Sequence, residues 1–202
     1  DIVFEDKDLI ARNTAFFIDE RLAIINTELD SVETGKEKFK ERLDREITLV
    51  KNNYPDATVI GLADGARDNW DYLESRVDKQ ILDFYHASES LGSVAPIISR
   101  KTSEQKKWLE TRCHKLKHKS GAASRILNEL KELSSHKMTN LLRERLKAAI
   151  SYFTYHKSKM CYAKERALNH PIGSGVTEAG CKVIVKQRLC KSGMKWKEKG
   201  AG

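Results

Sequence analysis

Residues 57–63, ATVIGLA, form a continuous run of apolar and β-branched residues whose length suits a single strand. A run without polar alternation is typical of a strand that is covered on both faces, as in a parallel sheet between helices. Asp64 and Gly65 end the run. Because such a strand needs both sheet partners and helical cover, this segment constrains the fold more than any other.

Helical and strand patterns alternate around this run. Apolar residues recur at the spacing of one helix face within 36–52. Short apolar runs at 22–29 and 79–83 have strand length, and a helical pattern begins at about Tyr85. This order predicts an α/β fold with a parallel sheet and helical cover. In such sheets the functional crevice lies at the carboxyl ends of the strands, which is where we expect Asp64 and Asp83.

The chain changes character at Arg100. From there to residue 168 it contains no proline, and its apolar residues recur at helical spacing, so we expect three or four helices. After a break at Pro171, a Gly-rich turn introduces a last helix, predicted from about Gly175 to Lys191. We therefore expect three parts: a β/α part at 1–99, an all-helical insertion at 100–168, and a final helix with its tail at 169–202.

The net charge of +8 conceals a strong asymmetry. Residues 1–99 hold 12 Lys and Arg against 21 Asp and Glu (−9), whereas residues 100–202 hold 25 against 8 (+17). The basic half is therefore the expected surface for a phosphate backbone, although Lys-rich helices can also simply present solvated faces. No apolar run has membrane-spanning length and the first ten residues are acidic, so we expect neither a membrane partner nor a signal peptide.

Three carboxylates mark the ends or beginnings of separate elements: Asp64, Asp83 and Glu178, the last in the first turn of the final helix. Oxygen ligands that converge from different elements suit Mg²⁺ or Mn²⁺, and two such ions roughly 3.5–4 Å apart catalyse phosphoryl transfer. Taken singly, each residue has a simpler explanation. An Asp before Gly is typical of a turn, and the helix dipole favours a Glu in a first turn.

Four blocks of sequence match one family. They are ADGARDNWDYL (63–73), DFYHASESL (83–91), YFTYHKSKMCYA (152–163) and PIGSGVTEAGCKVIVKQRLCKSGMKW (171–196). In the order and spacing of these blocks, the chain from about Leu22 onward resembles DDE-type insertion-sequence transposases, most closely the ISKra group, whose catalytic domain has the RNase H-like fold. The resemblance implies an incomplete RNase H-like sheet with helical cover, interrupted by an all-helical insertion before the helix of the catalytic glutamate.

The resemblance also implies roles for single residues. Asp64 would be the second catalytic aspartate and Glu178 the catalytic glutamate, and both would bind metal in a two-metal site for Mg²⁺ or Mn²⁺. Asp83 and His86 would be auxiliary residues, acting as ligand, orienter or DNA contact. Contacts to DNA phosphates are expected from the basic residues that follow the glutamate. These are Lys182, Lys186, Arg188, Lys191 and Lys195.

The family's first catalytic aspartate lies on the first strand of the sheet, and no position in residues 1–30 matches its motif. We therefore expect the chain to be the central and C-terminal part of a transposase, with weak or no strand transfer by itself. Its expected partners are DNA and further copies of the chain in a transposition complex, and its expected location is the bacterial cytoplasm, at the nucleoid. Two other functions stay open: a truncated remnant that binds DNA through its basic half without catalysis, and a helical protein whose charge asymmetry serves only its own packing.

Overall fold

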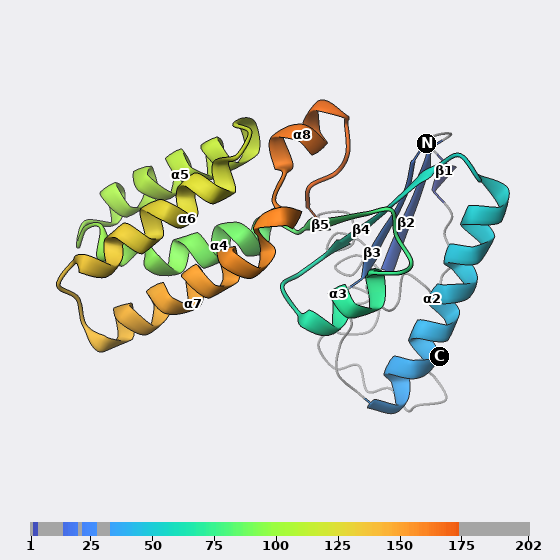
Figure 1. The fold of residues 1–202 in the computed structure, drawn as a ribbon, viewed down its shortest axis with the longest axis horizontal. Helices are drawn as coiled ribbons and strands as arrows, with labels where there is room; N and C mark the ends of the chain where they lie inside the picture. The colour runs from blue at the N-terminus through green and yellow to red at the C-terminus, as the bar shows by residue number, and fades with distance from the viewer. Residues whose placement is uncertain (1, 4–13, 20–21, 28–32, 174–202) are drawn as a thin grey trace, which may run out of the picture. The chain divides into compact units, whose positions relative to one another are not determined.

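In the described residues, three strands are followed by alternating helices and strands, and after these come helices alone (Figure 1). The computed structural model describes residues 2–3, 14–19, 22–27 and 33–173. By their contacts, these residues divide into two units, one that reaches Gln80 and another that runs from Ile81 to Gly173. The α/β organisation expected from the sequence is therefore present.

The described strands form a five-stranded sheet, and its first four strands belong to the first unit. Its strands are β1 (Ile2–Val3), β2 (Thr14–Asp19), β3 (Leu22–Thr27), β4 (Thr58–Ala63) and β5 (Lys79–Leu82). The first three pair antiparallel, whereas β3 and β4 pair parallel with Ile24 opposite Ile60. The order in the sheet follows the order in the chain, so β4 lies between β3 and β5. The strands predicted at 22–29, 57–63 and 79–83 are thus confirmed, and the boundary between the two units falls within β5.

Strand β4 is the buried strand that its composition predicts. Its most buried side chains, each at most 1% exposed, are Val59, Ile60, Leu62 and Ala63. Helix α3 (Arg67–Leu73) packs against this strand at Gly61, where an added Cβ would lie only 3.0 Å from Leu73 Cδ1. Glycine is used here because it lets the helix approach the strand closely.

Helix α2 (Glu33–Asn53) covers the range 36–52 that was predicted from the spacing of apolar residues. Of that apolar face, Leu43, Ile47 and Val50 are 0%, 4% and 6% exposed. The helix ends before Pro55, as expected, because a proline disfavours helical backbone at the residue preceding it. Burial of this one face accounts for the position of α2 in the unit.

A hydrogen-bonded network joins α2 to α3 and to Arg76, which follows it. The Tyr72 hydroxyl donates to Asp44 Oδ1 at 2.6 Å, and Arg76 donates from Nε to Oδ1 at 2.5 Å and from Nη2 to Oδ2 at 3.1 Å. The Arg76 guanidinium also lies 4.1 Å from the centre of the Tyr72 ring. The hydrogen bonds from Arg76 hold the pKa of Asp44 below its usual value, and burial raises the pKa of Tyr72. The network therefore favours the ionised form of Asp44.

Replacing Asp44 by Asn removes the charge that Arg76 binds. The Arg76 and Asp44 side chains are 32% and 42% exposed, so solvent screening limits the loss, and we expect the free energy of unfolding to fall by about 1 kcal/mol at neutral pH. Because the folded-state pKa of Asp44 is depressed, its contribution is present above the ordinary value of 3.8 and is lost as the pH falls through the folded value. Urea denaturation of Asp44→Asn and of the unmodified chain, at about pH 7 and about pH 2.5, tests this. An equal difference at both pH values would contradict it.

The second unit is built from helices, coloured green to orange in Figure 1. They are α4 (Phe84–Val94), α5 (Thr102–His118), α6 (Ala122–Glu132), α7 (Asn140–His156) and α8 (Tyr162–Ala167), with 3₁₀ turns at Ala95–Ile97, Leu133–Ser135 and Lys157–Lys159. Helix α7 packs against α4 and α6, and α5 packs against α4, α6 and α8. By these contacts α4, which the sequence analysis assigned to the part at 1–99, belongs to the helical unit.

The helical unit has its own apolar core. Ile126 and Leu130 of α6 are buried against α7, whose Leu146 and Phe153 are also buried. These side chains confirm the helical spacing read from the sequence. Residues 138–168, a single stretch without proline, are nevertheless divided into two helices by the turn after His156. Within the described ranges, no helix is long and apolar enough to cross a membrane.

Candidate functional site

Asp64 directly follows strand β4, and its carboxylate is held in one orientation. Its Oδ1 accepts hydrogen bonds from the Ala66 backbone N–H at 2.8 Å and from the Asn69 side-chain amide at 2.9 Å. Its Oδ2 accepts none from the residues that the structure describes. Asp64 is half-buried, so this second oxygen belongs to a fixed group that can still take a ligand.

Asn69 positions Asp64, a role that the sequence analysis did not assign. Its side chain is 1% exposed, and the amide that donates to Asp64 carries an Oδ1 that is buried without a hydrogen-bond partner among the described residues. A buried polar atom without a hydrogen bond lowers the stability of the fold, so it calls for an explanation. Orienting the functional carboxylate of Asp64 would be one. Asn69 lies in the first turns of α3, five residues beyond Asp64, and that spacing was the only signal in the sequence.

Asp83 caps helix α4. Its Oδ1 accepts hydrogen bonds from the backbone N–H groups of Tyr85 at 2.6 Å and His86 at 3.3 Å, and the residue is 1% exposed. An Asp at this position satisfies N–H groups that have no partner within the helix. The His86 side chain lies 3.4 Å from Glu89 Oε2 on the same helix. Asp83 and His86 are therefore brought together, through the backbone of His86.

The start of α4 is also a meeting point of sequence blocks, which we call the motif junction and define by Phe84, Tyr162 and Ile172. The Phe84 backbone N–H donates to the Ile172 carbonyl at 2.8 Å. The Phe84 ring packs edge-on against Tyr162 with 5.3 Å between ring centres. Beside the junction, a Cβ added at Gly173 would lie 3.9 Å from Asp83 Oδ2. Three of the four blocks quoted above thus meet at this place.

Tyr162 forms the buried floor of the motif junction. It is 0% exposed, and its hydroxyl has no hydrogen-bond partner in the described part of the chain. Burial raises the pKa of Tyr162, with smaller contributions from Tyr152 and Asp83. The tyrosine is therefore a neutral side chain at physiological pH, and it packs rather than titrates.

A short turn held by Glu165 directs the chain to the junction. The His170 ring nitrogen Nδ1 lies 2.7 Å from Glu165 Oε2, and the His170 backbone N–H donates to the Glu165 carbonyl at 2.9 Å. Between them, Asn169 adopts a left-handed backbone with φ of 58°. Glu165 is 4% exposed, so the pair lies largely out of water. The sequence analysis identified the break at residues 169–171 but not this pair.

The structure describes only some of the predicted site residues, and those belong to two different units. Asp64 belongs to the first unit, and Asp83 and His86 belong to the second. Glu178 and the five basic residues predicted to contact DNA lie outside the described residues. Among those described, no group of three or more His, Cys, Asp or Glu side chains is placed to hold a metal ion. The Mg²⁺ or Mn²⁺ site stays a prediction.

Comparison with known proteins gives no relative for this chain. No protein-family model, no curated protein and no solved structure matches it.

The capping role of Asp83 can be separated from its charge. Asp83→Ala leaves the first turn of α4 without its cap, and we expect it to lower the free energy of unfolding by about 1–2 kcal/mol. Asp83→Asn keeps an acceptor oxygen that caps equally well, so it should retain most of this stability. Chemical denaturation of the three proteins measures both effects. If Asn proved as destabilising as Ala, the negative charge rather than the cap would be the important property.

Proposed function

We propose that the chain belongs to a DDE-type insertion-sequence transposase and contributes to its catalytic domain, with an RNase H-like fold. In the intact protein this domain would carry out metal-dependent phosphoryl transfer, cutting DNA and joining the strand to a target. Asp64 and Glu178 are the proposed catalytic residues. Asp83 and His86 are the proposed auxiliary residues, and Asp83 also fixes the start of α4.

The observation that carries this proposal is the motif junction. Its three residues come from three of the blocks that resemble one family, and the block of Phe84 lies far along the chain from the blocks of Tyr162 and Ile172. The junction also makes the helical unit begin and end at one point, with Phe84 beside Ile172. A unit whose two ends adjoin can be inserted into a host domain without disturbing it, as the family's helical insertion requires.

Asp64 fits the proposed metal. Hard cations such as Mg²⁺ prefer carboxylate oxygens, and Asp64 offers one oxygen while its other oxygen is fixed by Ala66 and Asn69. Glu178 follows Gly173 by five residues, a length of chain that spans at most roughly 18 Å. A bound Mg²⁺ pair would activate water or a 3′-hydroxyl and stabilise the leaving oxygen. The chain's own part is to orient the Asp64 carboxylate.

The alternative is a remnant that binds DNA through its basic half and has no catalytic activity. It is supported by the charge of residues 100–202, with 25 Lys and Arg against 8 Asp and Glu, and by the lack of a match to the first aspartate motif within residues 1–30. This alternative shares the DNA surface with the first proposal and differs in metal binding.

Calorimetric titration with Mn²⁺ separates the two. We expect the unmodified chain to bind Mn²⁺ and Asp64→Asn to bind it roughly tenfold more weakly or not at all. Asp71→Asn is the matched control, because it removes one exposed carboxylate from helix α3, which follows Asp64 in the chain. Equal binding by all three proteins would contradict the role of Asp64.

A second readout concerns catalysis. If a DNA duplex is nicked in the presence of Mn²⁺, Glu178→Gln should abolish the nicking. DNA binding without any Mn²⁺ binding would instead establish the remnant. Failure to bind either DNA or Mn²⁺ would contradict both forms of the proposal.

A further inference from the structure

Helices α5 and α8 bring together five side chains that carry or can carry positive charge, which we call the α5–α8 cluster. Its members are His114, Lys117, His118, Lys119 and Arg166. Helices α5 and α8 are in contact, and Arg166 Nη1 lies 3.0 Å from His118 Nε2. The rings of His114 and His118, one helical turn apart, have centres 4.5 Å from each other.

The α5–α8 cluster has no counter-charge from the described residues. None of its members forms an ion pair with a carboxylate of the described residues. All of them are exposed except Lys117, which is half-buried. The neighbouring acids are engaged elsewhere, since Glu129 binds Arg112 and Lys115 while the buried Glu165 binds His170. The positive charge of the cluster is therefore available to an anion from outside.

The pKa of His118 also reflects the positive charge gathered in the cluster. Desolvation and the positive charge of Arg166, followed by that of His114, Lys117 and Lys119, lower the pKa of His118 below its usual value. His118 thus remains neutral at neutral pH, where its ring nitrogen can accept from the Arg166 guanidinium. Helix packing holds these groups together against their mutual repulsion, which a bound anion would relieve.

The cluster borders the motif junction. Lys117 Nζ lies 4.3 Å from the centre of the Phe84 ring, and the Phe84 backbone is bonded to Ile172. A polyanion that lies along the α5–α8 cluster therefore reaches the start of α4, where Asp83 is located. Duplex DNA carries one negative charge per roughly 1.7 Å of its axis, so it can supply several phosphates to a cluster of this kind.

We propose that the α5–α8 cluster binds the phosphate backbone of duplex DNA and holds the duplex beside the motif junction. The inference rests on the proposed function in that DNA is the partner, but it assigns a phosphate surface to the helical unit in addition to the basic residues that follow Glu178. These contacts position DNA and do not read its sequence.

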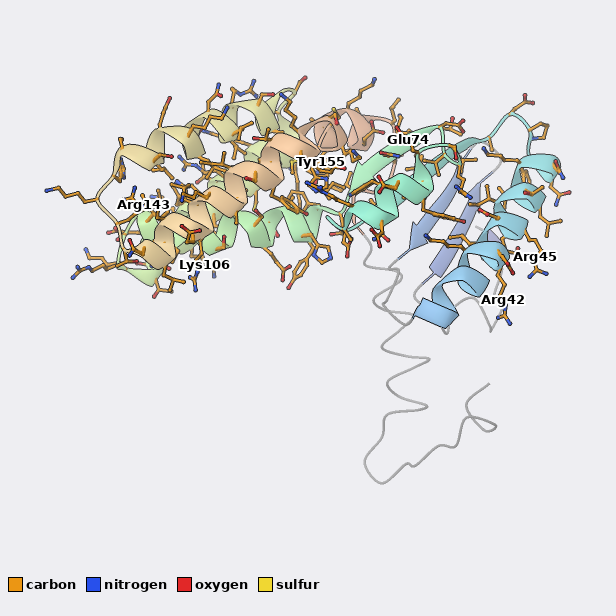
Figure 2. All side chains as sticks on the ribbon, turned by 60° about the horizontal axis from the view of Figure 1, so that its bottom comes forward. Arg42, Arg45, Glu74, Lys106, Arg143 and Tyr155 are labelled. Carbon is orange, nitrogen blue, oxygen red and sulfur yellow. The ribbon has the colours of Figure 1, made fainter. Side chains whose placement is uncertain are left out.

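The test is the salt dependence of DNA binding by the whole chain. Fluorescence anisotropy with a labelled duplex of about 30 base pairs gives the affinity over roughly 50–200 mM salt. The cluster variant is Lys119→Gln with Arg166→Gln. The matched control is Arg143→Gln with Lys147→Gln, two exposed cations of α7, of which Lys147 is paired with Glu144 at 3.2 Å. Figure 2 shows Arg143 at the opposite end of α7 from Tyr155.

The expected result is a salt slope that is smaller by about 2 in the cluster variant, roughly one per phosphate contact removed, and nearly unchanged in the control. Circular dichroism of both variants checks that they remain folded. An unchanged slope in the cluster variant overturns the inference, and so does an equal loss in the control, since that would reflect net charge alone. Tighter binding of an RNA of the same length overturns the choice of DNA. If the unmodified chain binds no DNA, the proposed function fails as well, whereas DNA binding that is indifferent to the cluster overturns this inference only.

Discussion

The hydrogen bond between the Phe84 N–H and the Ile172 carbonyl closes the helical unit on itself. Five helices lie between these two residues, and a single backbone contact brings the chain back to where it left the strand β5. The contact depends on its surroundings: Asp83 fixes the first turn of α4, Tyr162 supports the Phe84 ring, and Glu165 shapes the turn before Ile172. The residues that follow Gly173, which carry the most distinctive block of the sequence, leave from this fixed point.

The helical unit concentrates positive charge because its basic residues outnumber its acids. Residues 81–173 hold 18 Lys and Arg against 8 Asp and Glu, a balance of +10. Asp83 caps a helix, Glu165 holds His170, and Glu129 binds two cations from α5. Other acids pair with exposed lysines at the surface. The unit nevertheless keeps its excess of cations over acids, and such an excess would suit a polyanionic partner.

The sequence predicted the elements well because their signals are local. The apolar run at 57–63 and the apolar stripe of α2 depend only on the periodicity of burial, and both are confirmed. The capping role of Asp83 could have been predicted too, since an Asp immediately before a helical pattern is a helix-start signal. Asn69 and the pair of Glu165 with His170 could not, because a buried amide or a short turn gains its partner only when the chain has folded. That α4 belongs to the helical unit could not be predicted either, because α4 contacts α7, and these two helices are far apart in the chain.

Asp64 and Asp83 occupy equivalent places in the sequence, each at the end of an apolar strand, yet the structure gives them different chemistry. Asp83 is buried and one of its oxygens receives two N–H groups at the positive end of a helix, an arrangement that satisfies a carboxylate and weakens its tendency to bind a cation. Asp64 is half-buried, and its oxygen Oδ2 receives nothing from the described residues. A cation would therefore gain more from Asp64 than from Asp83. In the proposed site Asp64 would therefore be the metal ligand of the pair, whereas Asp83 caps the neighbouring helix.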